Sequence, residues 1–167
     1  LQPSDLFPEK PVTAKRTIQA TYDYKDADGT LLFQAVRYSP KGFSQRRPDG
    51  KGGWLFDLKG VTRVLYRLPD LKGRQAILFC EGEKDVEAAM KLGIPATCNP
   101  MGAGKWDPAY VKQLQSAGVV RVAVIPDNDE VGRAHAATVA ASLHAAGIEV
   151  RVPELPGLSD HGDLSDY

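Results

Sequence analysis

The second half of the chain alternates short apolar runs with longer segments of helical spacing, and this alternation limits the fold more than any other feature. The short runs are residues 76–80, 95–99, 119–125 and 148–155, and the longer segments are 83–93, 107–118 and 130–147. Strands that alternate with helices of this length form a parallel sheet with helices on its faces. We therefore predict an α/β domain over residues 74–167, with ligands bound beyond the carboxyl ends of the strands.

The chain begins with an arm and a hairpin. Residues 1–16 are rich in proline and without periodicity, which indicates a linker or arm. Residues 17–24 and 31–38 are β-prone runs, and the Asp28-Gly29 pair between them is a hairpin signal. The chain starts with leucine rather than methionine, so we expect it to be a piece of a longer protein.

A basic segment joins the hairpin to the α/β domain. Residues 39–53 are rich in glycine and basic side chains and predict a loop, and a third apolar run follows over 54–58. Residues 61–71 predict a helix, because apolar side chains stand there at helical spacing: Val61, Val64, Leu65 and Leu68. Residues 17–73 are therefore predicted to form a small β-rich subdomain with one helix.

Charge is distributed unevenly although the net charge is zero. Residues 31–75 hold ten Lys or Arg against three Asp or Glu, whereas residues 76–167 hold seven against thirteen. This polarity indicates one surface for a polyanion and another for cations. Cys80 and Cys98 are expected to be buried thiols in a reducing compartment. Because no apolar run approaches 18 residues and no signal peptide is evident, we expect a soluble, cytoplasmic protein without a membrane partner.

Acidic residues follow the predicted strands where their carboxyl ends should meet. Glu81 comes directly after residues 76–80, and Asp85 lies about one helical turn further on. Asp127 and Asp129 follow the third strand, and alternate residues of an extended segment point the same way. Helix capping would explain some of these acids. Because gathered carboxylates repel one another unless a cation neutralises them, the pattern favours a Mg²⁺ or Mn²⁺ site for phosphoryl chemistry.

These motifs resemble a known family. "LFCEGEKDVEAAMKLG", "VAVIPDNDEVGRAHAATVA" and "GDLSDY" are similar to the toprim domain, which is shared by bacterial-type primases, type IA and II topoisomerases and some nucleases. The resemblance implies a Rossmannoid parallel sheet flanked by helices. It also implies an acid/base role for Glu81 and metal binding by Asp127 and Asp129, supported by Asp85. The last motif usually carries Lys-Asp where this chain has Gly162-Asp163, so Asp163 is a further candidate metal ligand and Asp166 stays an alternative to it.

Residues 22–71 resemble the region before the toprim domain in primase/helicase proteins of phages and integrated elements. This resemblance implies a single-stranded DNA template, nucleoside triphosphates as substrates, and a helicase or ATPase in the same or a partner chain.

Basic side chains supply candidates for phosphate and nucleic-acid contacts. Lys84, Lys105 and Arg133 lie near the expected acidic edge and could contact phosphate, although solvent exposure or an ion pair would explain Lys105 and Arg133 as well. The predicted nucleic-acid track, interleaved with aromatic residues, comprises Arg37, Lys41, Arg46, Arg47 and Lys51. The three histidines are assigned no role.

The resulting hypothesis is the catalytic region of a DNA primase, a metal-dependent nucleotidyltransferase. Its catalytic residues would be Glu81, Asp127 and Asp129, and all three would also bind one or two Mg²⁺ ions. A 3′-hydroxyl would attack an α-phosphate and release pyrophosphate. Two alternatives stay open: a metal-dependent nuclease that uses the same carboxylates, and a non-catalytic DNA-binding module with a vestigial acidic site.

Overall fold

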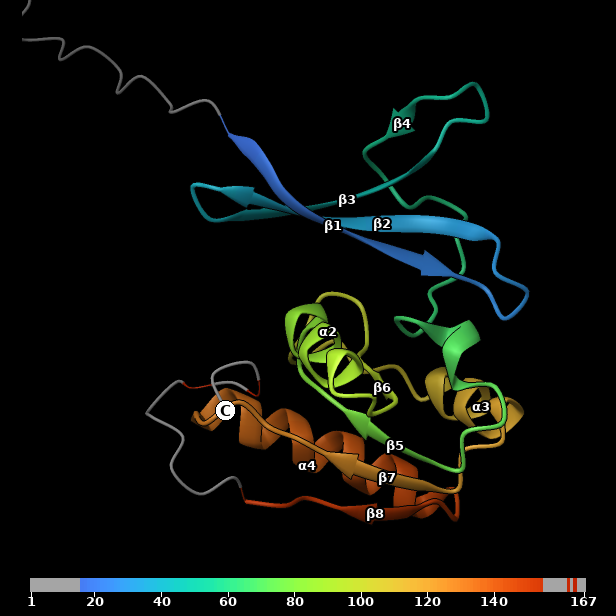
Figure 1. Cartoon of the computed structure of the whole chain (residues 1–167), viewed down its shortest axis with the longest axis vertical. Helices are drawn as coiled ribbons and strands as arrows, with labels where there is room; N and C mark the ends of the chain where they lie inside the picture. Colours follow the sequence, from blue (N-terminus) through green and yellow to red (C-terminus); the bar gives the residue numbers. More distant parts are fainter. Residues whose placement is uncertain (1–15, 155–161, 163, 165–167) are drawn as a thin grey trace, which may run out of the picture.

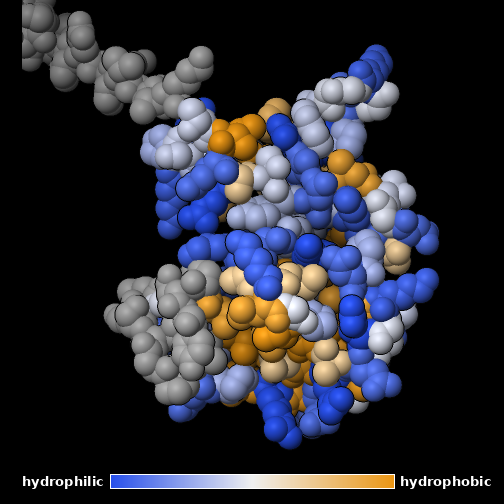
Figure 2. Space-filling view, in the orientation of Figure 1, coloured by the Kyte–Doolittle hydropathy of each residue, from blue (hydrophilic) through white to orange (hydrophobic). Residues whose placement is uncertain are grey.

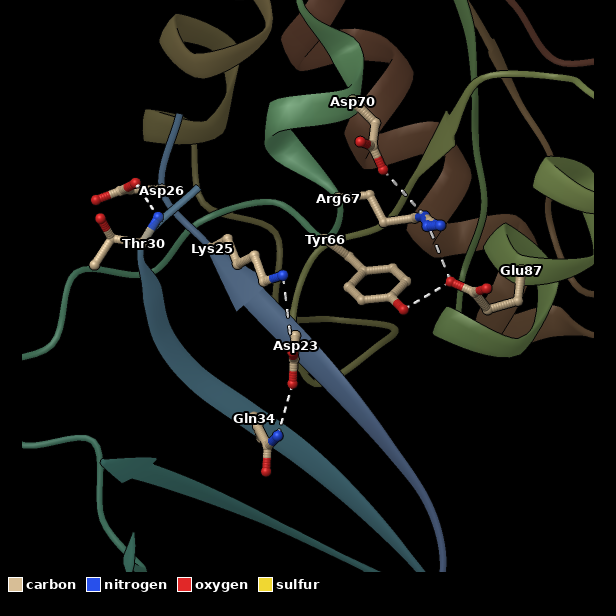
Figure 3. Close-up of polar contacts among 9 residues, drawn as sticks. All are labelled: Asp23, Lys25, Asp26, Thr30, Gln34, Tyr66, Arg67, Asp70 and Glu87. Atoms are coloured by element: carbon tan, nitrogen blue, oxygen red, sulfur yellow. Dashed lines mark hydrogen bonds and ion pairs between the residues drawn. The ribbon is translucent and has the colours of Figure 1, made fainter. Parts of the chain in front are cut away.

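The computed structural model describes residues 16–154, 162 and 164, and within them the chain forms two four-stranded sheets (Figure 1). The first sheet is antiparallel, in the order β1-β2-β3-β4. Its strands are β1 (Thr17–Lys25), β2 (Leu31–Ser39), β3 (Gly42–Pro48) and β4 (Trp54–Leu55). The β1–β2 hairpin is confirmed. Its turn is held by Asp26, whose Oδ1 accepts from the backbone N–H groups of Asp28 and Thr30 at 3.0 and 2.9 Å (Figure 3 shows the contact with Thr30).

The prediction of a loop over residues 39–53 was wrong in part, because this segment contains β3. Composition alone disfavours a strand here, but β2 provides both a backbone ladder and polar partners. Arg46 Nε donates to Gln34 Oε1 at 2.8 Å, and the Tyr38 and Ser44 hydroxyls are 2.9 Å apart. These cross-strand contacts stabilise the pairing of a polar sequence.

The predicted helix over residues 61–71 was also wrong. Only the short 3₁₀ helix η1 (Leu68–Leu71) forms, after Arg67 adopts a left-handed conformation at φ 55°. Just before η1, two backbone N–H groups bond to distant segments: that of Leu65 donates to Gln113 Oε1 and that of Tyr66 to the Cys98 carbonyl. The apolar residues of this segment are therefore buried from an extended chain, which the periodicity could not distinguish from a helix.

The second sheet is parallel, as predicted, in the order β6-β5-β7-β8. Its strands are β5 (Ala76–Phe79), β6 (Ala96–Thr97), β7 (Arg121–Val124) and β8 (Glu149–Arg151). The helices that connect them are α2 (Glu83–Lys91), α3 (Ala109–Ala117) and α4 (Glu130–Ala145). Because Phe79 pairs with both Thr97 and Val124, β5, β6 and β7 end side by side at one edge. This register confirms the α/β class and brings the segments after β5 and β7 together.

The two sheets share one hydrophobic core. Tyr24 and Phe33 of the first sheet are fully buried, stack at 4.4 Å between ring centroids, and belong to the same cluster as Phe79 and Val86. This core is continuous across residue 73. The predicted domain boundary at that residue stays a prediction. A polar cluster joins η1 to α2 (Figure 3): the Tyr66 hydroxyl donates to Glu87 at 2.7 Å, and Arg67 pairs with Glu87 and Asp70.

Both cysteines are free and buried, as expected. No helix of the described residues is long and apolar enough to cross a membrane. On the face turned to the viewer in Figure 2, apolar side chains gather over the parallel sheet. A groove of about 370 Å³ lies along β5 and β7 and is lined by Ala76, Leu78 and Ala123 among others.

Candidate active site

A cleft of about 640 Å³ separates the antiparallel sheet from the acidic edge of the parallel sheet. One wall comes from β2, β3 and the segment after β4, and includes Ala35, Phe43, Ser44, Gln45, Phe56, Asp57, Leu58 and Arg63. The opposite wall carries the acids and a glycine-rich loop, with Glu81, Gly82, Glu83, Asp85, Met101, Gly102, Ala103 and Asp127. Ligand sites usually occupy clefts of this size at the ends of parallel strands.

Glu81 occupies the centre of the acidic wall, directly after β5. The Asp127 backbone N–H donates to its carboxylate, while Asp129 and Asp85 lie near enough to repel its charge. Burial raises the pKa of Glu81, and Asp129 and Asp85 raise it further against the opposing hydrogen bond from Asp127. Its Oε2 atom is buried and has no hydrogen-bond partner among the described residues. A carboxylate in this state fits a proton acceptor or a cation ligand.

Gly132 allows the start of α4 to approach Glu81 and Asp127. A Cβ atom at this position would lie 2.6 Å from the Asp127 carbonyl oxygen, 2.8 Å from Glu81 Oε2 and 3.0 Å from the Asp127 nitrogen. The segments after β5 and β7 therefore meet around a helix position that has no space for a side chain. Glu81 and Asp127 lie at the same edge of the sheet, which the predicted metal site requires.

Asp129 serves as the N-cap of α4. Its Oδ1 accepts from the Gly132 N–H at 2.7 Å, so the capping explanation applies to this residue. Capping uses one of its carboxylate oxygens, and the negative charge of Asp129 still acts on Glu81.

The remaining acids differ in position. Asp85, in the first turn of α2, is 5% exposed and lines the cleft. Glu83 accepts a hydrogen bond from the Tyr24 hydroxyl at 2.7 Å, which ties the acidic edge to the antiparallel sheet. Asp163 and Asp166 lie outside the described residues. Gly162, one residue before Asp163, accepts from the Asn128 N–H at 2.9 Å.

The carboxylates at this edge are candidate ligands of a divalent cation. Within the described residues, no three His, Cys, Asp or Glu side chains converge closely enough to form a metal site. The buried Oε2 of Glu81 nevertheless lacks a partner among these residues, and the charges of Asp85 and Asp129 destabilise its ionised form. A hard cation that takes oxygen ligands would relieve both costs, so these residues fit Mg²⁺ or Mn²⁺.

The glycine-rich loop of the acidic wall is held by a network that sequence reasoning missed. His135 of α4 is buried, its Nδ1 accepts from the Gly104 N–H at 3.2 Å, and its Nε2 lies 3.1 Å from Asn99 Oδ1. Asn99 Nδ2 donates in turn to the Gly102 carbonyl at 2.8 Å. A polar asparagine at the end of the apolar run 95–99 was the available sequence signal.

The three predicted phosphate contacts lie on exposed positions near the acidic edge. Lys84 is in the first turn of α2, and Lys105 is in the glycine-rich loop. The Arg133 guanidinium donates to Asn128 Oδ1 at 3.4 Å rather than pairing with Glu130 or Asp129.

The predicted nucleic-acid track is divided between two faces of the antiparallel sheet. Arg37 pairs with Phe43, so Arg37, Phe43 and Arg47 share the face that carries the cleft wall. Arg46 lies on the other face, with its guanidinium 4.1 Å from the Trp54 ring centroid. Arg47 forms an ion pair with Asp57 at 3.0 Å.

The other two track residues, Lys41 and Lys51, are exposed beyond the ends of β3. Roles for all five stay predictions.

Comparisons with known proteins agree with this geometry. The sequence profile of the toprim-like family matches residues 78–167. A DNA primase of Chlamydia muridarum (strain MoPn / Nigg) is 31% identical over 130 residues, which are 71% of this chain and 22% of the relative. The chain therefore spans less than a quarter of the length of this curated primase.

Solved structures with this fold include two primases. The primase fragment of the bacteriophage T7 primase-helicase protein matches with a TM-score of 0.60 and 23% identity, over 87% of this chain and 55% of that chain. A DNA primase domain from Pseudomonas aeruginosa matches with a TM-score of 0.64 and 22% identity, over 95% of this chain and 50% of that chain. The family profile covers more than half of the sequence and includes the acids after β5 and β7. The chain belongs to the toprim-like family.

Proposed function

We propose that this chain carries the catalytic site of a DNA primase, which joins nucleotides on a single-stranded DNA template. The observation that carries the proposal is the half-buried Glu81 carboxylate, which contacts the Asp127 backbone and is repelled by Asp129 and Asp85 at the wall of a cleft. Similarity to DNA primases supports this activity over the others known for the toprim domain.

In the proposed mechanism, the acids have two roles. Asp85, Asp127 and Asp129 would hold the divalent cation, which would supply neutralisation of phosphate charge when bound. Glu81 would accept the proton of the attacking 3′-hydroxyl, since its raised pKa matches a proton acceptor better than that of an ordinary surface glutamate. Asp163 stays a further candidate ligand. Lys84, Lys105 and Arg133 would contact the phosphates of the nucleoside triphosphate.

The template would lie against the antiparallel sheet, opposite the acids. Arg37 shares the sheet face that carries the cleft wall, and Arg63 lines the cleft directly. Lys41 and Lys51 would extend this cationic surface beyond the cleft. The T7 protein to which the chain is similar is a primase-helicase, and we propose a helicase as the partner, in the same or another chain. The origin in a phage or integrated element and the cytoplasmic location stay predictions.

The test is primer synthesis by the chain with single-stranded DNA, mixed ribo- and deoxynucleotides, and Mn²⁺ or Mg²⁺. We expect extension products from the wild type and from Glu149→Gln, which removes an exposed acid on β8. Glu81→Gln and Asp127→Asn should abolish synthesis while keeping a cooperative melting transition. Full activity of either variant would refute the mechanism. Cleavage of labelled DNA without nucleotides would instead identify a nuclease, and DNA binding without any metal-dependent chemistry would identify a binding module.

A further inference from the structure

Two phenylalanine rings are exposed on the cleft wall that faces the acids. Phe43 of β3 is 60% exposed and Phe56, after β4, is 63% exposed, and both line the cleft. In contrast, Phe33 and Phe79 are almost completely buried. Burial of a phenylalanine side chain stabilises a protein by about 1.5–3 kcal/mol relative to exposure, so two open rings in one cleft indicate a surface for an apolar ligand.

A buried amide on the same wall lacks its hydrogen bond. Gln45 lines the cleft two residues after Phe43 and therefore shares its face of β3. Its Nε2 atom is buried and finds no acceptor in the part of the chain that the structure describes. The unpaired donor therefore already carries a cost of about 1–3 kcal/mol, and it reaches a ligand only if the partly exposed Gln45 side chain rotates toward the cleft. A ligand that combines an apolar surface with a hydrogen-bond acceptor would relieve this cost after the rotation.

Cationic groups accompany the two rings. The Arg37 guanidinium lies 5.9 Å from the centroid of the Phe43 ring. Arg63 lines the same cleft, and its Nη1 is held by the Leu58 and Val61 carbonyls at 3.1 and 2.6 Å. Planar rings, an amide donor and adjacent guanidinium groups together match unpaired nucleobases on a phosphate backbone. Two rings on separate segments suit two bases of one strand better than a single nucleotide, which has only one base.

We propose that Phe43, Phe56 and Gln45 form a nucleobase-binding wall for an unpaired DNA strand, with the bases stacked on the rings and the Gln45 amide rotating to donate to a base edge. The proposal rests on the proposed primase function, because it assigns the template to this wall of the same cleft. It makes these three side chains the determinants of base-dependent binding, separate from the salt-dependent phosphate contacts.

The test compares two labelled oligonucleotides of equal length and charge, one of oligo(dT) and one in which every base is replaced by an abasic tetrahydrofuran unit. Affinities for the chain are measured by fluorescence anisotropy without nucleotides and without divalent metal. The wild type should prefer the base-containing strand by about tenfold or more, as base–aromatic stacking predicts. Phe43→Ala and Phe56→Ala should each lose about fivefold or more of this preference, and their affinity for the abasic strand should be unchanged.

Three further variants separate stacking from structural damage. Leu92→Ala truncates a side chain at the end of α2 that is 77% exposed and outside the cleft, and should bind like the wild type. Phe43→Tyr should restore the preference, because a tyrosine ring also stacks. Gln45→Met keeps the length of the side chain without the donor, and should reduce affinity for the base-containing strand only.

The outcomes distinguish this proposal from the primase function. Equal binding of the two oligonucleotides by the wild type, or an unchanged preference in both alanine variants, would overturn the nucleobase wall even if primers are synthesised. Base-dependent binding that is lost in these variants would support the wall even if the chain makes no primers. Displacement of the strand by a single nucleoside triphosphate at equal base concentration would contradict the choice of a strand as the ligand.

Discussion

Gly132→Ala tests whether the acidic edge is assembled as described, because two explanations of this glycine predict opposite signs. A glycine in a helix without close neighbours is destabilising, so replacement by alanine should stabilise the protein by about 1 kcal/mol. Here the new Cβ would meet the Asp127 carbonyl oxygen at 2.6 Å and Glu81 Oε2 at 2.8 Å. Overpacking of this kind costs about 1–3 kcal/mol, and the tightest contact is with backbone that cannot rotate away.

We expect the upper end of that range, and hence a net destabilisation of about 2 kcal/mol after the helix-propensity gain is subtracted. For a domain of this size, such a change lowers the melting temperature by about 4–8 °C. Ala137→Gly, at an exposed position of the same helix, measures the propensity effect alone. Adding Glu81→Ala to Gly132→Ala should recover little stability, because the contact with Asp127 remains.

The assay is thermal unfolding followed by circular dichroism, together with primer synthesis at a temperature where both proteins are folded. Gly132→Ala should melt below the wild type and lose activity, since Glu81 and Asp127 must move apart. A melting temperature raised by about 2–4 °C, as for an alanine in an open helix, would refute the packing of α4 against these two residues.

Three further predictions concern pH and the contact between the two sheets. Because the pKa of Glu81 is raised on folding, its ionised form opposes folding. Glu81→Gln should therefore melt at or above the wild-type temperature at pH 7, and the two curves should converge below about pH 4; a large loss of stability at pH 7 would contradict this. Burial lowers the pKa of His135, so its stabilising contribution is present above about pH 6.5 and lost as the pH falls. Melting of the wild type and of His144→Asn should thus decline from pH 7 to 5 more steeply than that of His135→Asn, and parallel curves for all three would exclude the neutral histidine. Tyr24→Phe removes the 2.7 Å hydrogen bond to Glu83 and should cost about 0.5–1.5 kcal/mol in urea unfolding, whereas no change would show that the contact does not join the sheets.

The parallel sheet was predictable because its signals are local and regular. The two central strands, β5 and β7, are short and largely apolar, and a recognisable helix stop, Gly118, precedes β7. The carboxyl ends of parallel strands lie at the same edge of a sheet. Glu81 after β5 and Asp127 after β7 could therefore be predicted to lie close together, although more than forty residues separate them in the sequence.

The antiparallel sheet and the details of the site depended on contacts between distant segments. β3 forms from a polar sequence because β2 supplies its partners, and the chain at Leu65 is extended because Gln113 satisfies its backbone N–H. The role of His135 follows from Asn99 and Gly104, which are more than thirty residues away. Single-sequence periodicity contains none of this information.

The most direct test of the central claim is the binding of Mn²⁺ to the chain, measured by the loss of the electron paramagnetic resonance signal of the free ion. The account predicts binding at millimolar or lower concentration by the wild type and by Glu149→Gln, and affinity reduced about tenfold or more by Asp127→Asn. Equal affinity in the wild type and Asp127→Asn, or no binding by the wild type at millimolar Mn²⁺, would contradict it.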